Sequence, residues 1–291
     1  MKKITVFTST YNRAFCLPQL YESLCRQTSK DFVWLLIDDG SKDNTEELVK
    51  EWILDNRINI KYVKKENGGM HTGHNMAYQL IETELNVSID SDDFMPENAV
   101  ELIMNTWAKS KNHNLAGIVG LDSTQDGIII GTKLPEVAQG SFNDIYEKYN
   151  CRGDKKVVLR TEIVKKYELY PEHKNEKLVP LGCLYNLIGK DYNFIYANEV
   201  YCIVEYLTDG SSHSIFNQYK QSPRGFIHAR KVHNKVSKNQ FILLKNAIHI
   251  GSSAIFAKDI CLLKENGRTF WNILMLPFGI MLNGYIRWKI K

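Results

Sequence analysis

The fold is set by the stretch Leu85-Asn86-Val87-Ser88-Ile89-Asp90-Ser91-Asp92-Asp93. Its apolar first part predicts a buried strand, and three carboxylates follow within four residues. Like charges this close repel one another unless a cation lies between them. Carboxylate oxygens suit Mg²⁺ or Mn²⁺, which bind one or two protein carboxylates together with substrate phosphates. The stretch therefore predicts a metal–diphosphate site at the carboxyl end of a strand, with a solvated acidic turn as the alternative.

Three further apolar strands precede this one, and helix signals separate them. The strands are expected at residues 4–9, 32–37 and 60–63, and the helices at about 18–27, 44–55 and 74–82. Apolar strands that alternate with helices are typical of a parallel sheet covered on both faces. We therefore expect an α/β fold in which helices flank a mostly parallel sheet.

Each expected strand ends in polar residues, which are Thr8 to Asn12, Asp38-Asp39, Asn67 to His71 and Asp90 to Asp93. In open α/β sheets, ligands bind outside the carboxyl ends of the strands, where the strand order reverses. Four polar strand ends on one edge indicate a nucleotide site.

In these motifs the sequence resembles the inverting family 2 glycosyltransferases, which have a GT-A fold. The matching segments are Val6 to Asn12, Ile37 to Thr45, Asn67 to Gly69 with His74-Asn75, and Ile89 to Asp93. The resemblance covers roughly residues 1–210, and several later segments match a subgroup of bacterial surface-polysaccharide glycosyltransferases. It implies that an acceptor hydroxyl attacks the anomeric carbon of a nucleotide-diphosphate sugar, with inversion.

The resemblance also implies a catalytic base. Glu176 is its expected position, with Glu172 as the fallback and Asp154 as a weaker choice. Many relatives carry Glu-Asp here, whereas this chain has Lys177 after Glu176.

For the metal, Mn²⁺ or Mg²⁺, the resemblance implies Asp92 and Asp93 as ligands. Asp39 resembles the acid that accepts a hydrogen bond from uracil, which makes UDP the expected donor nucleotide. His74 replaces a basic residue of many relatives, and a neutral histidine would make a weaker contact. The residues expected to bind the nucleotide sugar are Thr8, Thr10, Tyr11, Arg13, Asp39, Asn67, Gly68, His71, Asn75, Asp90 and Ser91.

Some of these residues have plain structural alternatives. Tyr11 either stacks on the base or packs on the protein, and Arg13 either reaches phosphate or is an ordinary surface arginine. Asp38 is an alternative capping residue for the fold. His213 and His228 either complete the metal or phosphate site in a closed form or are surface histidines.

Length and composition set broad limits. The chain has 291 residues, of which 44% are hydrophobic and 24% charged, enough for one domain with additions or two small ones. Six scattered cysteines suggest neither a zinc site nor a disulfide framework, so we expect a reducing cytoplasm. We expect no signal peptide and no membrane span, since a strand begins near the N-terminus and no apolar stretch reaches about 18 residues.

The net charge of +4 hides an asymmetry. Residues 215–291 hold 13 Lys and Arg against two acidic residues, a charge of +11, so the preceding residues carry −7. Residues 270–291 combine aromatic and aliphatic side chains with terminal cations, which predicts a segment lying on an anionic membrane surface. The alternatives are a helix packed on the core or at an oligomer interface. No nucleic-acid motif accompanies the charge, so we expect no nucleic-acid partner.

We expect a GT-A domain over residues 1–214, with a nucleotide-binding half at 1–122 and an acceptor-side half at 123–214. Residues 215–291 are expected to form a basic helical region, with helices over 224–236 and 238–264.

The sequence thus predicts a metal-dependent hexosyl- or N-acetylhexosaminyltransferase. Its expected donor is a UDP-sugar, and its expected acceptor is a hydroxyl of a glycan or lipid-linked molecule in capsule or other surface-polysaccharide synthesis. The enzyme is expected at the inner face of the cell membrane. A nucleotidyltransferase is the first alternative, although such enzymes usually need glycines where this chain has Thr10 to Arg13. The second alternative is a non-catalytic scaffold subunit that binds a sugar nucleotide. It is retained because Lys177 replaces an acid that many relatives carry beside Glu176.

Overall fold

The computed structural model describes residues 2–110, 114–205, 215–264 and 268–290, which form two compact units. The first unit comprises Met1–Glu168 and Ile188–Leu207, and the second Leu169–Leu187 and Thr208–Lys291. Leu169–Leu187, which we expected in the acceptor-side half, therefore groups with the C-terminal helices. The predicted boundary at residue 214 and His213 both lie outside the described residues, so that boundary stays a prediction.

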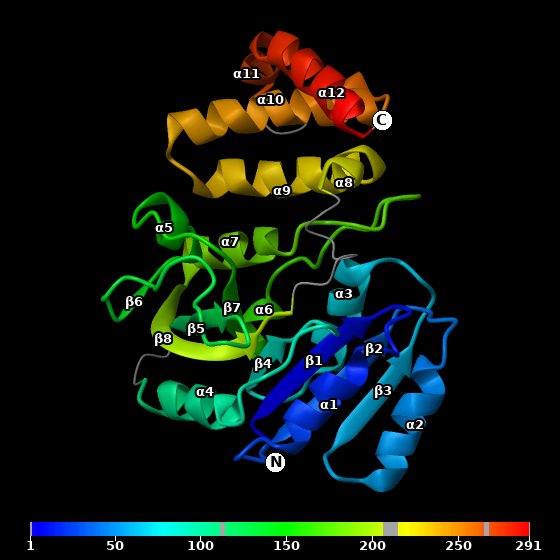
Figure 1. The fold of residues 1–291 in the computed structure, drawn as a ribbon. Coiled ribbons are helices and arrows are strands. Elements are labelled where there is room, and N and C mark those ends of the chain that lie inside the picture. Colours follow the sequence, from blue (N-terminus) through cyan, green and yellow to red (C-terminus); the bar gives the residue numbers. More distant parts are fainter. Residues whose placement is uncertain (1, 111–113, 206–214, 265–267, 291) are drawn as a thin grey trace. The chain divides into compact units, whose positions relative to one another are not determined.

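The first unit is built on a mixed sheet, which in the described residues has eight strands in the order β3-β2-β1-β4-β7-β5-β8-β6 (Figure 1). The strands are β1 (Ile4–Thr10), β2 (Phe32–Asp38), β3 (Ile60–Lys64), β4 (Leu85–Ser88), β5 (Leu115–Ser123), β6 (Gln139–Gly140), β7 (Lys155–Arg160) and β8 (Asn193–Ile203). β1 to β4 run parallel, as do β5 and β8, whereas β7 and β6 pair antiparallel with their neighbours. The predicted mostly parallel sheet flanked by helices is confirmed.

The helices of this unit follow the expected alternation. They are α1 (Leu17–Cys25), α2 (Thr45–Asp55), α3 (Met70–Leu80), α4 (Ala99–Ala108), α5 (Phe142–Glu147) and α6 (Thr161–Val164). α7 (Gly182–Asp191) runs from the sequence range of the second unit into that of the first. α3 begins four residues before the predicted start, because Gly69 supplies the positive φ of +96° from which the helix starts.

Both faces of the sheet are covered. On one face, Trp34 of β2 lies in a buried cluster with Leu20 of α1. On the other, Phe7 of β1 packs edge-on against Tyr78 of α3, with ring centroids 5.5 Å apart. Gly73 lets α3 approach this closely, since a Cβ there would lie 2.2 Å from a β1 side chain. The two covered faces explain why these strands are apolar throughout.

The second unit contains a set of helices in its C-terminal part: α8 (Ile215–Gln221), α9 (Pro223–Val236), α10 (Gln240–Phe256), α11 (Thr269–Leu274), α12 (Leu276–Lys289) and the 3₁₀ helix η2 (Ile260–Lys264). The single helix predicted over 238–264 is wrong at its end. α10 stops at Phe256, and Lys258 takes a left-handed φ of +54°, which turns the chain into η2. None of the described helices is both long enough and apolar enough to span a bilayer.

Candidate active site

Four polar strand ends share one edge of the sheet. β3, β2, β1 and β4 are adjacent and parallel, with Thr10 level with Asp38 and Asp38 level with Lys64. The strand order reverses at β1, because β2 lies on one side of it and β4 on the other. The carboxyl ends of β1 and β4 therefore mark the switch point, which is where such sheets bind ligands. The predicted common edge is confirmed.

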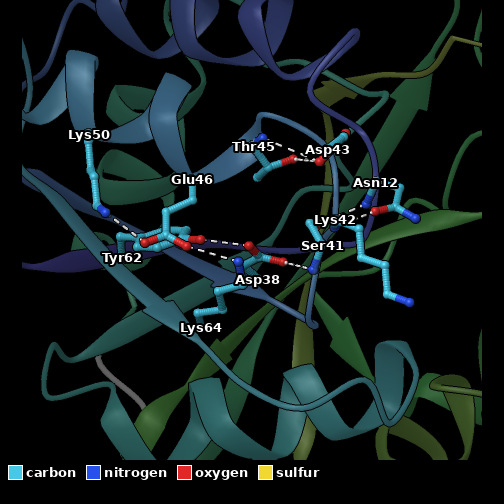
Figure 2. Close-up of polar contacts among 10 residues, drawn as sticks. All are labelled: Asn12, Asp38, Ser41, Lys42, Asp43, Thr45, Glu46, Lys50, Tyr62 and Lys64. Atoms are coloured by element: carbon cyan, nitrogen blue, oxygen red, sulfur yellow. Dashed lines mark hydrogen bonds and ion pairs between the residues drawn. The ribbon is translucent and has the colours of Figure 1, made fainter.

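The loop after β1 is held to the loop after β2 (Figure 2). Asn12 donates its backbone N–H to Ser41 Oγ at 2.9 Å, and Asn12 Oδ1 accepts the backbone N–H of Lys42 at 2.8 Å. Asn12 takes a φ of +53°, a conformation that asparagine tolerates. This fixed loop presents the Tyr11 ring at the edge, 42% exposed, where a planar base can stack on it.

Asp38 supports the fold, as its capping alternative implied. Its Oδ1 accepts the backbone N–H of Ser41 at 2.7 Å, and its Oδ2 accepts the Tyr62 hydroxyl at 2.6 Å (Figure 2). Burial and the Asp38 carboxylate raise the pKa of Tyr62, so the hydroxyl remains a donor. The two contacts hold the β2 end against β3.

Asp39 is buried and holds the loop between β3 and α3. Its Oδ1 accepts from Lys65 Nζ at 2.7 Å and from the backbone N–H of Gly68 at 2.9 Å. Its Oδ2 accepts from the backbone N–H of Gly69 at 2.7 Å and from Asn67 Nδ2 at 3.1 Å. Lys65 was not predicted as a partner of Asp39, because a lysine after a strand gives no sign that it will pair with a buried carboxylate. The contact of Asp39 with uracil stays a prediction.

The two threonines predicted to line the pocket differ in their surroundings. Thr8 is fully buried, and its Oγ1 accepts the Trp34 Nε1–H at 3.1 Å, a contact inside the core. Thr10 Oγ1 is also buried, but among the described residues it has no hydrogen-bond partner. A buried hydroxyl without a partner costs about 1–3 kcal/mol. A ligand atom at this edge would supply that partner, which favours Thr10 over Thr8 as a binding residue.

Helix α3 buries its predicted site residues His71 and Asn75 as well as His74. Burial lowers the pKa of His74 to about 3, with His71 adding to the effect, so His74 is neutral at pH 7. Its Nε2 lies 3.3 Å from Ser88 Oγ, and its ring packs edge-on against Phe7 at 4.9 Å. His74 therefore belongs to the packing and brings no charge to a phosphate. The nucleotide contacts of His71 and Asn75 stay predictions.

The acidic corner after β4 has an inner and an outer part. Asp93 is buried, where its Oδ1 accepts the backbone N–H of Glu205 at 3.3 Å and its Oδ2 accepts the Cys202 thiol at 3.6 Å. Burial raises the pKa of Asp93 to about 7, although a nearby lysine opposes the shift. Asp90 and Asp92 are only half-buried. They are thus the more accessible carboxylates of the corner.

The nearby lysine is Lys156 on β7, the antiparallel neighbour of β4. Its Nζ lies 3.9 Å from Asp122 Oδ1, and the two side chains are only 13% and 3% exposed. Burial lowers the pKa of Lys156, but Asp122 and other acidic neighbours outweigh it and hold that pKa well above its ordinary value. Neither Lys156 nor Asp122 was predicted from the sequence. The only available signal was a lysine entering an apolar strand.

The donor set of the corner fits a hard divalent cation. Asp90 and Asp92 both add to the raised pKa of Asp93, so they create a negative potential that a cation would relieve. Burial and the Asp92 carboxylate raise the pKa of the Cys16 thiol, which also contacts Ser91, to about 11. The turn before α1 therefore lies beside Asp92. Within the described ranges, no group of three or more His, Cys, Asp or Glu side chains is arranged to hold a metal. Mg²⁺ and Mn²⁺ use one or two carboxylates with substrate oxygens, which this corner offers.

The predicted base, Glu176, belongs to the second unit and lies at the N-terminus of α9. Its Oε2 accepts the backbone N–H groups of Arg224 at 2.9 Å and Gly225 at 3.0 Å. Its Oε1 lies 3.6 Å from the Arg224 guanidinium. Glu176 is 9% exposed, whereas the fallback Glu172 is exposed. Glu176 therefore caps a helix, and its role as base stays a prediction.

His228 lies on α9 of the same unit. Burial, with His173 close by, lowers the pKa of His228 to about 4. The ring is therefore neutral at pH 7 and would contact a phosphate without charge.

A family model described as Glycosyl transferase family 2 matches residues 5–156, more than half of the chain. Poly(ribitol-phosphate) beta-N-acetylglucosaminyltransferase TarP of Staphylococcus aureus is 29% identical over 124 residues, which covers 42% of this chain and 38% of TarP. Teichoic acid poly(glycerol phosphate) polymerase of Staphylococcus epidermidis is 29% identical over 120 residues, covering 41% of this chain and 16% of the polymerase. The chain thus matches well under two thirds of the length of these curated relatives.

Two solved structures share the fold. S. aureus TarS 1-349 in complex with UDP-GlcNAc superposes with a TM-score of 0.62 at 16% identity, covering 99% of this chain and 92% of that one. Mannosyltransferase PcManGT from Pyrobaculum calidifontis, in complex with GDP-Man and Mn²⁺, gives a TM-score of 0.59 at 15% identity, with 99% and 88% covered. The likeness confirms the predicted GT-A fold.

Proposed function

The chain belongs to glycosyl transferase family 2, and from this premise we propose that it transfers a sugar from a UDP-sugar to a hydroxyl of a glycan or lipid-linked acceptor in surface-polysaccharide synthesis. The UDP assignment is supported by TarS, whose structure contains UDP-GlcNAc. The acceptor class is supported by the relatives named for teichoic acid polymers. The charge of +11 on residues 215–291 supports a place at the inner surface of the cell membrane.

One observation carries the proposal: β1 and β4 are adjacent and parallel, so the side chains that follow them lie at the same edge of the sheet. The exposed ring of Tyr11 and the buried hydroxyl of Thr10 lie at the end of β1. Asp90 and Asp92 follow the adjacent β4, and Asp92 lies beside the turn that carries Cys16. An aromatic ring, a hydroxyl without a partner and an acidic corner suit a base, a ribose and a metal-bound diphosphate, in that order.

In the proposed reaction the acceptor oxygen bonds to the anomeric carbon while the bond from that carbon to the diphosphate breaks. The diphosphate leaves with the bonding electrons, and the acceptor proton passes to a carboxylate. We propose Glu176 as that base, with Glu172 as the alternative, and such a base contributes about 10²–10⁴-fold in rate. Bound Mn²⁺ or Mg²⁺ would compensate the charge of the leaving diphosphate. We propose that Asp92 and Asp90 hold the metal, and that Asp93, first expected beside Asp92 as a ligand, belongs to the buried network with Lys156.

Binding and turnover test the proposal separately. We expect UDP and UDP-sugars with Mn²⁺ to raise the melting temperature more than GDP does, since a ligand at 100 times its Kd stabilises the fold by about 2.7 kcal/mol. Asp92→Asn should lose the Mn²⁺-dependent part of that shift and about 10²–10³-fold in kcat. Asp126→Asn, an exposed acid in a turn, is the matched control and should change neither.

Each other outcome has a meaning. Pyrophosphate release from a nucleoside triphosphate would identify a nucleotidyltransferase, and tight UDP-sugar binding without turnover would identify a scaffold subunit. Absence of both nucleotide stabilisation and transfer would contradict the assignment.

A further inference from the structure

The face that helix α12 turns to the protein includes a glycine and an asparagine. It packs on α10 in the second unit (Figure 1). A Cβ at Gly279 would lie 2.9 Å from the Ile248 carbonyl oxygen, so the two helices cross at close range. The buried Asn283 donates its Nδ2–H to the Ser252 carbonyl oxygen at 3.1 Å. A surface helix normally turns its apolar side inward, whereas two of the three buried residues of α12 are Gly279 and Asn283, and only the third, Ile286, is a large apolar residue.

The large apolar side chains of α12 point outward instead. Phe278, Met281, Tyr285 and Trp288 are spaced by three and four residues, so they form one stripe along the helix. They are 54%, 70%, 47% and 66% exposed. At about 100° per residue, the centre of this stripe lies roughly 145° from the centre of the buried face formed by Gly279, Asn283 and Ile286. The helix α12 therefore exposes an apolar stripe, while its buried face combines Gly279 and Asn283 with a single large apolar residue, Ile286.

The preceding helix also buries a polar residue and exposes apolar ones. In α11, Asn272 is fully buried and donates to the Leu263 carbonyl oxygen at 2.7 Å, while Phe270, Trp271 and Ile273 are exposed. The outward residues of α11 and α12 form what we call the C-terminal apolar face, which comprises Phe270, Trp271, Ile273, Phe278, Met281, Tyr285 and Trp288. Large exposed apolar faces on otherwise polar proteins mark docking surfaces.

Cations flank this face. Lys289 lies about 60° to one side of the centre of the α12 stripe and Arg287 about 140° to the other, where its Nε–H donates to Asn283 Oδ1 at 2.7 Å, and both residues are exposed. Lys289 Nζ lies 5.0 Å from the centre of the Trp288 ring and 5.9 Å from that of Tyr285. Aromatic rings with long cationic side chains at the border of an apolar face are the arrangement of helices that lie at a lipid–water boundary.

The sign of the charge selects the occupant. Residues 268–291 contain Arg268, Arg287, Lys289 and Lys291 and no acidic residue. A second copy docking through the same face would bring like charges together, because a two-fold interface pairs a patch with itself. An anionic lipid surface complements both the apolar stripe and the cations.

We propose that the C-terminal apolar face docks on an anionic lipid surface. α12 lies along the surface with its stripe at the headgroup–acyl boundary, and Arg287 and Lys289 reach lipid phosphates. The inference deepens the membrane location given in the proposed function, but it is independent of the transfer chemistry and of the donor site.

Vesicle sedimentation with the full chain tests the proposal. We expect binding to vesicles that contain phosphatidylglycerol and little binding to pure phosphatidylcholine. Arg287→Gln with Lys289→Gln should weaken binding about 30-fold, since each cation near such a surface contributes about five-fold. Phe278→Ser with Met281→Ser should weaken it by about ten-fold or more. The emission of wild-type tryptophans should shift to the blue on binding, as Trp271 and Trp288 enter the boundary.

Matched controls come from exposed residues outside the face. Phe241 on α10 is 85% exposed, so Phe241→Ser removes an exposed aromatic side chain outside the face. Lys238→Gln removes an exposed cation of the same region. Both should bind like the wild type, and UDP-dependent stabilisation should be the same in every variant, which keeps this test apart from that of the reaction. Equal binding by face and control variants would overturn the proposal. So would a dimer that face variants dissociate in the absence of lipid, because the occupant would then be a second copy.

Discussion

Replacing Glu176 by glutamine separates the two duties that this carboxylate combines. As the predicted base it must accept the acceptor proton, and as a capping group it accepts two backbone N–H groups at the start of α9. Glutamine keeps the volume and one acceptor oxygen of Glu176 but cannot take up a proton. The substitution therefore removes the base while leaving most of the cap.

The contacts of Glu176 determine how large each effect on stability should be. Loss of the charge at a helix N-terminus, together with weaker hydrogen bonds, should lower the free energy of unfolding by about 1–2 kcal/mol for Glu176→Gln. Glu176→Ala also leaves the buried Gly225 N–H without its acceptor, so we expect about 3 kcal/mol. The Arg224 contact adds little to either figure, because that guanidinium is 37% exposed. In contrast, kcat of Glu176→Gln should fall by about 10²–10⁴-fold.

The assay pairs urea unfolding with turnover at saturating donor, so that stability and chemistry are read on the same preparation. Glu172→Gln, on the same loop but exposed, is the control and should match the wild type in both. Turnover of Glu176→Gln within about three-fold of the wild type would refute the base assignment and leave Glu176 as a cap alone. A large loss of kcat in Glu172→Gln would move the base to that residue.

Three further predictions follow from buried polar groups. Thr10→Val should stabilise the unliganded protein by about 1 kcal/mol and weaken UDP binding about five-fold or more, because the buried hydroxyl has no partner until a ligand binds. Thr8→Val removes the acceptor of the Trp34 indole N–H, so it should lower the stability of the fold without weakening UDP binding. Calorimetry of both variants measures these effects. The pKa of His74 is lower in the folded protein than in the unfolded chain, so the unfolded chain binds more protons between about pH 3 and 6.5. The protein is therefore more stable above this pH range, and its free energy of unfolding falls as the pH falls through the range. The share of His74 is about 2 kcal/mol between about pH 7.5 and 5, and urea titrations should show a shallower pH slope for His74→Asn. Lys156→Met should lower the free energy of unfolding by about 3–5 kcal/mol, because it leaves the buried Asp122 carboxylate without its cation. Adding Asp122→Asn should recover part of this loss. Additive effects of the two substitutions in a double-mutant cycle would contradict the pairing of Lys156 with Asp122.

The main elements could be predicted because their signals are local. The strands and helices of the first half follow from apolar runs and cap residues within short windows, and parallel strands place their polar ends together without further information. The family motifs lie at those strand ends for the same reason. The end of α10 was missed because Lys258 takes a left-handed φ, which no sequence pattern around it signals.

The sequence by itself determined the alternating α/β architecture, the edge at which polar residues gather and the basic, aromatic character of residues 270–291. Only the tertiary structure decided which polar groups on that edge are already paired: Asp39 holds a loop and Thr8 accepts an indole N–H, whereas Asp93 turns inward. It also decided that α12 turns its aromatic side outward. The physical reason is that strand order and helix packing bring these partners together from distant parts of the chain, while sequence periodicity reports only on near neighbours.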